Sequence, residues 1–216
     1  PTLRDFHAEL LRQPEPEARD VALAIELFTE GSLNTFAKPT NVDTNSRILC
    51  YDIRDLGKQL LPVGMLVVLD SVFNRIIRNR RLGRSTWVYI DEIYLLFQHE
   101  YSANFLFTLW KRVRKYGACC TGLTQNVDDL LQSHTARTML ANSEFLVMLN
   151  QASTDRAELA RLLNISDNQL SYITNVDFGR GLIKCGSAIV PFMDHFPKNN
   201  LYRLMSTKPS EADAAV

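Results

Sequence analysis

The segment from Thr86 to Leu96, Thr-Trp-Val-Tyr-Ile-Asp-Glu-Ile-Tyr-Leu-Leu, constrains the fold most. A run of β-branched and aromatic residues, Trp87–Ile90, ends in two adjacent acids, Asp91 and Glu92, and apolar residues resume directly after them. Such a run predicts a buried strand of a parallel sheet, and open α/β sheets bind ligands at the carboxyl ends of their strands. We therefore expect an α/β fold that presents both carboxylates at one edge of its sheet.

Two adjacent acids at a strand end have the form of a Walker B motif. In that motif the first acid, here Asp91, holds Mg²⁺ through its water shell, and the second, Glu92, orients and deprotonates the water that attacks a γ-phosphate. A simpler interpretation is that both acids begin the next helix, whose positive end favours carboxylates. The dipeptide alone does not separate the two interpretations, because acidic strand ends are common.

The composition excludes several classes of protein. The 216 residues, 46% of them hydrophobic, are enough for one sizeable globular core. Lys plus Arg and Asp plus Glu are 24 each, so no net charge recruits nucleic acid or an anionic membrane, and any such binding must be local. The longest apolar run, Leu60–Leu69, is expected to be too short to span a bilayer, and no signal peptide is evident. The four cysteines and four histidines lack the spacing of a disulfide framework or a zinc site.

Two helices are expected before the sheet. Thr2, with Asp5 three residues later, resembles a capping box at the start of a helix over residues 3–11. Pro16 marks the start of a second helix, which Gly31 ends. Residues 31–46 are rich in Asn, Thr, Ser and Pro and predict a loop with one short turn. We therefore expect residues 1–46 to form a helical appendage and a loop.

Strands and helices alternate from residue 47 onwards, which is typical of a parallel sheet with right-handed crossovers. An antiparallel hairpin with a two-residue turn at Gly186-Ser187 is expected to close this core, which we place at residues 47–205 before a flexible tail at residues 206–216. The expected strands are Arg47–Ile53, Trp87–Ile90, Ala118–Thr124, Phe145–Leu149, Gly181–Cys185 and Ala188–Met193, and the expected helices are Val63–Arg80, Ser102–Tyr116, Asn126–Leu140 and Ser153–Leu163.

A polar amide, Gln125, follows the strand expected at Ala118–Thr124. The parallel arrangement places it beside the strand end that carries Asp91 and Glu92. An amide accepts from water and donates to a phosphate oxygen, so Gln125 is a candidate sensor of the γ-phosphate. The alternative is a cap of the following helix, a role that Asn126 fits better.

A basic run, Lys111-Arg-Val-Arg-Lys-Tyr-Gly117, lies between the two strand ends in the sequence. Basic residues suit a helix C-terminus, where each contributes about 0.3–1 kcal/mol, and this is a sufficient structural explanation for most of them. Helical spacing places Arg114 away from the apolar stripe of its helix, so it is also a candidate arginine finger that reaches a neighbouring subunit's nucleotide. A second cluster is a candidate for phosphate contacts or a solvated helix end, and consists of Arg75, Arg78, Arg80, Arg81 and Arg84.

The phosphate-binding motif of P-loop enzymes, G-x-x-x-x-G-K-[ST], is absent from the sequence. Gly117 and Gly122 have the glycine spacing, but Leu123 stands where the lysine should be. Gly57-Lys58 has no partner glycine at Asp52. Either the protein binds no nucleotide, or the first strand and phosphate loop of an ATPase lie upstream of Pro1.

The motifs and their order resemble the carboxyl-terminal ATPase domain of the large cytoplasmic ATPase of conjugative type IV secretion systems, the VirB/TraC/TrbE family. The resemblance covers nearly the whole chain and rests on Thr2-Leu-Arg-Asp-Phe6, Asn41-Val-Asp43, Val88-Tyr-Ile-Asp-Glu92, Arg114-Lys-Tyr-Gly117, Thr124-Gln-Asn126, Ala141-Asn-Ser143, Gly179-Arg-Gly181 with Leu182, and Pro191-Phe192.

The resemblance implies a RecA-like P-loop NTPase fold, with a mainly parallel sheet flanked by helices, related to the HerA and FtsK translocases. It implies a hexameric motor that uses ATP and Mg²⁺ to power pilus assembly and conjugative DNA or protein transfer, in the cytoplasm at the inner face of the membrane, together with other secretion components. Carried over by position, Asp91 is the magnesium acid, Glu92 the catalytic acid, Gln125 the sensor, and Arg114 with Lys115 the motif's basic pair.

In that family the phosphate loop precedes the region that matches Thr2, so we expect a fragment that lacks the P-loop strand and is inactive alone. Two other functions remain open. One is a nucleotide-free assembly module that docks onto other secretion components. The other is a piece of a DNA-translocating motor whose arginine clusters contact strand phosphates.

Overall fold

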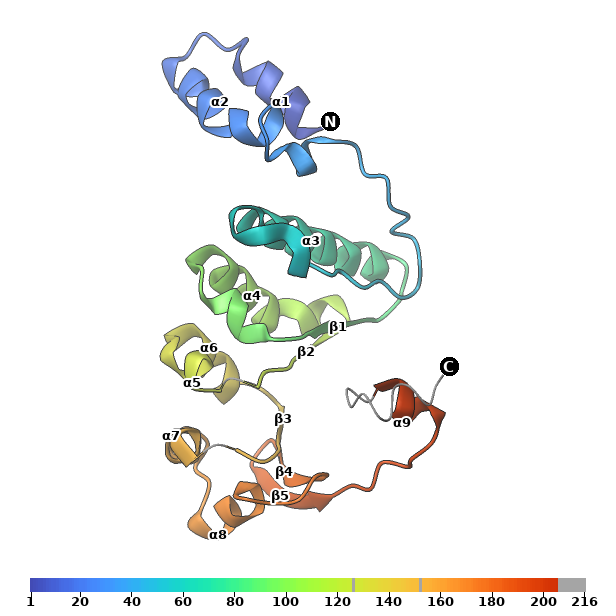
Figure 1. The fold of residues 1–216 in the computed structure, drawn as a ribbon, viewed down its shortest axis with the longest axis vertical. Coiled ribbons are helices and arrows are strands. Elements are labelled where there is room, and N and C mark those ends of the chain that lie inside the picture. The colour runs from blue at the N-terminus through green and yellow to red at the C-terminus, as the bar shows by residue number, and fades with distance from the viewer. Residues whose placement is uncertain (126, 152, 206–216) are drawn as a thin grey trace. The chain divides into compact units, whose positions relative to one another are not determined.

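The chain forms two compact units, Pro1–Arg84 and Ser85–Val216. The computed structural model describes residues 1–125, 127–151 and 153–205, with no side-chain description for residues 153–155. Helices form the first unit, and the strands belong to the second (Figure 1). The described elements are α1 (Leu3–Leu10), α2 (Pro16–Thr29), η1 (Asn34–Ala37), η2 (Arg54–Leu56), α3 (Gly57–Arg81), β1 (Thr86–Ile90), η3 (Ile93–Phe97), α4 (Glu100–Arg112), η4 (Val113–Tyr116), β2 (Ala118–Gly122), α5 (Val127–Gln132), α6 (His134–Ala141), β3 (Phe145–Met148), α7 (Ser153–Leu163), α8 (Asp167–Leu170), η5 (Ser171–Ile173), β4 (Arg180–Cys185), β5 (Ala188–Met193) and α9 (Asn200–Met205).

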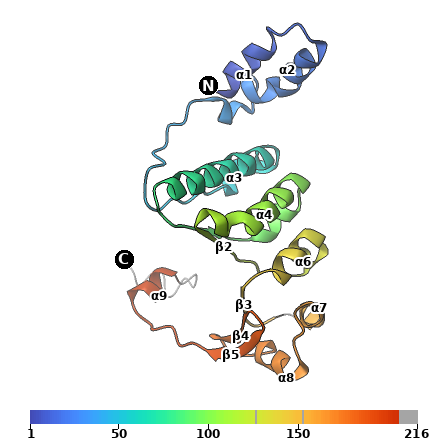
Figure 2. The ribbon, with the colours of Figure 1, turned by 180° about the vertical axis from the view of Figure 1, so that it is seen from behind.

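Helices α1 and α2 lie side by side, as both views show (Figures 1 and 2). The predicted capping box is confirmed, because the backbone N–H of Thr2 donates to the Asp5 carboxylate at 2.6 Å and the Asp5 N–H donates back to the Thr2 hydroxyl at 3.3 Å. The Arg4 side chain donates to the carbonyl of Thr29 at 3.1 Å, which ties α1 to the end of α2. The short turn expected after Gly31 is confirmed as η1.

The prediction of a strand at Arg47–Ile53 is wrong. The segment is irregular and pairs with no described strand. At its end the Asp52 carboxylate accepts from the backbone N–H of Arg54 at 3.1 Å and from its guanidinium at 2.5 Å. These bonds lower the pKa of Asp52 to about 2. An apolar run forms a strand only when a neighbouring strand pairs with it. Here the hydrogen bonds from Arg54 to the Asp52 side chain form a local turn, which competes with strand pairing.

Helix α3 begins at Gly57, not at the expected Val63, and it includes Pro62. A proline within a helix removes one hydrogen bond, to the carbonyl four residues earlier, and this loss falls close to the helix start. The helical stretch Arg54–Arg81, which contains α3, is long and apolar enough to cross a membrane by length and composition, whereas the expectation considered Leu60–Leu69 alone. A core helix of a water-soluble protein passes the same test.

Two arginines of the second basic cluster hold the loop that precedes α3. Arg75 donates to the carbonyls of Thr44 and, at 2.6 Å, Ser46. Arg78 donates to the side-chain oxygen of Asn45 at 3.2 Å. Their hydrogen-bonding capacity is thus partly used within the chain, which weakens the prediction that this cluster contacts phosphates.

The second unit contains the predicted parallel pair. Strands β1 and β2 are in register from Thr86 opposite Ala118 to Ile90 opposite Gly122. The crossover between them runs through α4, whose Leu106 is fully buried. Helix α4 packs beside α6, as both views show (Figures 1 and 2). This arrangement brings the carboxyl ends of β1 and β2 to one edge.

The fourth expected strand of the parallel sheet, β3, pairs instead with β4 in an antiparallel three-stranded sheet of order β3-β4-β5. Gly181 lets the backbones of β3 and β4 approach closely, because a Cβ on this residue would overlap the carbonyl oxygen of Met148. The backbone N–H of Gly186 extends the pairing by donating to the carbonyl of Glu144 at 3.1 Å. The predicted hairpin, with its turn at Gly186-Ser187, is confirmed.

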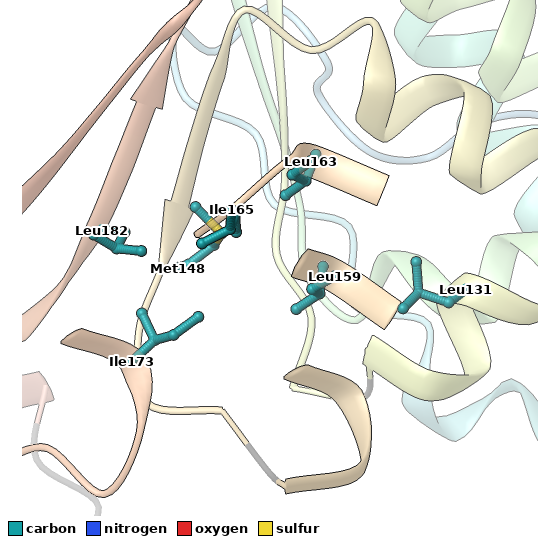
Figure 3. Close-up of a cluster of buried hydrophobic side chains, with 7 residues drawn as sticks. All are labelled: Leu131, Met148, Leu159, Leu163, Ile165, Ile173 and Leu182. Carbon is teal, nitrogen blue, oxygen red and sulfur yellow. The ribbon is translucent and has the colours of Figure 1, made fainter. Parts of the chain in front are cut away.

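One apolar cluster joins this sheet to the helices around it (Figure 3). It consists of Leu131, Met148, Leu159, Leu163, Ile165, Ile173 and Leu182. The helix expected from Asn126 to Leu140 is in fact two helices, because Ser133 caps α6 by accepting from the backbone N–H of Ala136 at 3.3 Å. The cap expected at Asn126 and the tail expected at residues 206–216 lie outside the described residues.

Candidate functional site

The carboxyl ends of β1 and β2 gather three of the predicted site residues. Asp91 and Glu92 directly follow β1, and Gln125 follows the end of β2. The backbone N–H of Gln125 lies 3.5 Å from Oε2 of Glu92. Asp91 and Gln125 are exposed, whereas Glu92 is half-buried. The structure therefore brings Glu92 and Gln125 together, as the sequence predicted.

The hydrogen-bond ladder continues past both strands with one extra residue on the β1 side. The N–H of Leu123 donates to the carbonyl of Ile90 at 2.8 Å, and the Leu123 carbonyl accepts from the N–H of Ile93 at 2.9 Å. In a regular parallel ladder that carbonyl would accept from Glu92. Two residues, Asp91 and Glu92, thus stand opposite Leu123 alone, in a turn that has the two-against-one count of a β-bulge and leads directly into η3, and we call this turn the bulge.

Glu92 is the strained residue of this bulge. Its backbone is left-handed, with φ 46° and ψ 49°, a conformation that costs a non-glycine residue about 1–2 kcal/mol. Its N–H, released from the ladder, donates to Oδ1 of Asp91 at 3.0 Å. Bulges beside active sites re-aim side chains, and backbone strain concentrates at such sites. The outlier therefore supports a functional interpretation of the two acids.

The donor atoms at this edge fit one half of a magnesium nucleotide site. Carboxylates suit Mg²⁺, which keeps several waters and is usually bound through one or two carboxylates and the substrate's phosphates. Asp91 and Glu92 provide such groups, and among the described residues no cluster of three or more His, Cys, Asp or Glu forms an all-protein metal cage. The lysine and backbone amides of a phosphate loop are not encoded in these 216 residues. The acids fit the metal, and these 216 residues do not encode the phosphate-binding motif that would accompany them.

The basic pair Arg114 and Lys115 lies at the opposite edge of this sheet. Both residues are exposed on η4, which ends at Gly117 and leads directly into β2. They therefore stand near the amino ends of the strands, and β2, with five residues at about 3.3 Å each, puts about 16 Å between them and the acids. The structure does not bring this pair to Glu92 within one chain.

Three residues that support the acids were not singled out as functional by sequence reasoning. They are Ile93, Gly122 and Leu123. A glycine inside a strand is a known signal of close backbone or side-chain approach, and Gly122 carried that signal. Nothing in the sequence pattern marks Ile93 or Leu123, because both resemble ordinary apolar residues at strand ends.

Comparisons with known proteins identify the fold and the family. The sequence model of the TraG P-loop domain matches residues 38–180. The structure of VirB4 of Thermoanaerobacter pseudethanolicus matches with a TM-score of 0.77 and 24% identity, over 93% of this chain and 56% of that chain, so this chain spans little more than half of that protein. A search of curated proteins found no match. The predicted P-loop NTPase type of α/β fold is confirmed, and the chain belongs to the TraG P-loop domain family.

Proposed function

We propose that this chain supplies the acids and the sensor amide of the nucleotide site in a motor ATPase that powers type IV secretion. One observation carries the proposal: the parallel register of β1 and β2 places Gln125 against Glu92 at a bulged strand end. Membership of a P-loop domain family supports a nucleotide as the ligand. The fold match to a VirB4 protein supports secretion as the process.

Each residue has a distinct role in this proposal. Bound Mg²⁺-ATP supplies the transferable γ-phosphoryl group and the charge neutralisation that its transfer needs. Asp91 holds the water shell of the metal. Glu92 accepts a proton from the attacking water. Gln125 orients that water and contacts the γ-phosphate through its amide. A phosphate loop from polypeptide beyond these 216 residues completes the site.

Arg114 and Lys115 act between subunits in this proposal. Their separation from the acids, about 16 Å along β2, supports action on the nucleotide of a neighbouring subunit rather than on that of their own chain. This requires a homo-oligomeric ring, and a hexamer is the state that the family resemblance implies. We place the ring in the cytoplasm at the inner face of the membrane, where it works with other secretion components on conjugative DNA or protein transfer and pilus assembly.

The test measures Mg²⁺-dependent ATP hydrolysis and ATP binding in the natural protein that contains this chain. Glu92→Gln keeps the size of the side chain and removes the base, so hydrolysis should fall by about 10²- to 10⁴-fold while ATP affinity is retained. Glu26→Gln, at an exposed position of α2, is the matched control and should hydrolyse normally.

Three outcomes would count against the proposal. Unchanged hydrolysis in Glu92→Gln would remove the catalytic role of the acid. Failure of the unsubstituted natural protein to bind or hydrolyse ATP would favour the nucleotide-free docking module. A DNA affinity that falls steeply with salt, with no ATP dependence, would instead favour a DNA-contacting role for the arginines.

A further inference from the structure

The side chain of Ile93 occupies the space above Gly122. A Cβ added to Gly122 would lie 2.5 Å from Cδ1 of Ile93, 3.3 Å from its Cγ2 and 3.4 Å from its Cβ. Real Cβ atoms essentially never approach another heavy atom to less than 3.0 Å, so a side chain at position 122 forces Cδ1, the far end of Ile93, to turn away, and the 3.3 Å contact with Cγ2 requires a further shift of a few tenths of an ångström. Ile93 is only 5% exposed, which leaves it little room to do so.

Ile93 is also the residue that closes the bulge. Its N–H donates to the Leu123 carbonyl at 2.9 Å, and it directly follows the left-handed Glu92. Glu92 is therefore held between a strand end at Ile90, paired with Gly122, and an anchored Ile93. A strained backbone persists only where its surroundings over-determine it, and these two contacts provide that restraint.

We infer that Ile93 and Gly122 are positioning residues that aim the Glu92 carboxylate at its reaction partner. The inference rests on the proposed function and adds two residues to its site. If Ile93 moves, the Leu123 carbonyl becomes available to the N–H of Glu92, and the ladder can return to its regular register. A change of register by one residue would re-aim the Glu92 side chain, because side chains alternate along a strand.

The experiment is a double-mutant cycle in the natural protein. Gly122→Ala should lower kcat for ATP hydrolysis by about 100-fold, the effect of misplacing a catalytic group by about 1 Å, with KM changed less than about twofold. Ile93→Val removes Cδ1, the atom that would clash, and is the second single variant of the cycle, against which the double variant is compared. The double variant Gly122→Ala with Ile93→Val should recover most of kcat, because the nearest remaining atom on Ile93 was 3.3 Å away.

Gly64→Ala is the matched control. A Cβ on Gly64 would overlap a side-chain atom of the half-buried Leu56, so this variant also forces a side chain to shift, but in the other compact unit. It should lose stability and keep kcat. An equal loss of kcat in Gly64→Ala and Gly122→Ala would show a general folding defect and overturn the inference.

A second measurement does not depend on catalysis. In the 216-residue chain, hydrogen exchange at the Ile93 amide should be slow, should accelerate at least tenfold in Gly122→Ala, and should slow again in the double variant. Unchanged exchange would overturn the inference whether or not the protein hydrolyses ATP. Loss of activity in Glu92→Gln with normal kcat in Gly122→Ala would overturn the inference and leave the proposed function standing.

Discussion

The backbone N–H of Gln125 faces Oε2 of Glu92 at 3.5 Å across 33 positions of sequence. The contact arises because two parallel strands end at the same edge and a bulge turns Glu92 toward its neighbour. At 3.5 Å it is a long hydrogen bond, which restrains the carboxylate only weakly. Glu92 therefore combines a fixed backbone with a side chain that remains available to a water molecule.

The 216-residue chain by itself should show no ATP hydrolysis above background. Its acids are in place, but the lysine and amides that hold the β- and γ-phosphates are not encoded in it. The measurement is phosphate release with and without Mg²⁺, with the chain carrying Glu92→Gln as the blank. Turnover that Glu92→Gln abolishes would contradict the prediction, because it would reveal a complete site without a phosphate loop.

In the natural protein, Asp91→Asn should raise the Mg²⁺ concentration at the midpoint of nucleotide binding by about 10- to 100-fold. This is the range seen when groups in the outer shell of a metal are removed. The variant loses the charge and keeps an oxygen that can accept from the N–H of Glu92, so the bulge is preserved. A titration of nucleotide binding against Mg²⁺ measures the shift. Asp20→Asn, at an exposed position of α2, is the control, and equal Mg²⁺ midpoints in both variants would refute the metal assignment.

Glycine and alanine should reverse their usual order of stability at position 92. At ordinary positions glycine is less stable than alanine by about 0.5–1 kcal/mol, because it loses more backbone freedom on folding. At φ 46° alanine keeps the strain of a Cβ and glycine does not, so Glu92→Gly should be more stable than Glu92→Ala by about 1 kcal/mol. Urea unfolding of the 216-residue chain measures both.

The control pair for this prediction is Thr108→Gly and Thr108→Ala, at an exposed position within α4 of the same unit. There glycine should be the less stable of the two by about 1 kcal/mol. The same order of stability at both positions would mean that Glu92 is not left-handed in solution.

Cys120 should resist alkylation far more strongly than its neighbour. Burial, with a smaller contribution from Cys119, raises the pKa of Cys120 to about 12. Only the thiolate reacts, so at pH 8 the reactive fraction is about 10⁻⁴, against roughly a quarter for an ordinary thiol. The fraction grows as pH rises toward the pKa, so labelling should accelerate with pH. Iodoacetamide labelling read by tandem mass spectrometry separates Cys120 from the exposed Cys119, and both should react alike in urea.

Much of the fold around the site could be predicted because it rests on local patterns. Apolar runs bounded by polar residues predicted β1, β2 and the hairpin, and capping chemistry predicted α1. Pairing was less predictable. The segment Arg47–Ile53 has the pattern of a strand, but no described strand pairs with it. Strand β3 pairs with β4, where Gly181 permits a close approach to the carbonyl of Met148. Strand partners are chosen by packing across the fold, and the sequence pattern of a single strand does not contain that choice.

The acids and the amide of the site could be predicted, whereas their geometry could not. Asp91, Glu92 and Gln125 are marked by residue type and by their place at strand ends. The bulge depends on a left-handed Glu92 and on Ile93 lying over Gly122, and neither is visible in periodicity. A regular continuation of β1 would have fitted the same sequence pattern. Tertiary contacts overrode the local preference of glutamate for ordinary backbone regions.

Arg114 should matter only in an assembled ring. It lies near the amino ends of the strands, about 16 Å from the acids along β2, so we expect it to act on the nucleotide of another subunit. In the natural protein, Arg114→Ala should therefore keep ATP affinity and the fold of the subunit and lower hydrolysis by up to about 10³-fold or more, as loss of an arginine finger does. Arg112→Ala, at the exposed end of α4, should cost about 0.3–1 kcal/mol of stability and little activity.

The deciding measurement mixes Arg114→Ala subunits with Glu92→Gln subunits. Each variant lacks one half of every interface in its own ring, and a mixed ring contains interfaces that pair an intact arginine with an intact acid. Hydrolysis should therefore recover to a maximum near an equal mixture. Rings of Arg114→Ala subunits alone are the control and should stay inactive. Native mass spectrometry would confirm that mixed rings form. Mixed rings that remain inactive at every ratio would show that Arg114 does not act on a neighbouring subunit's nucleotide.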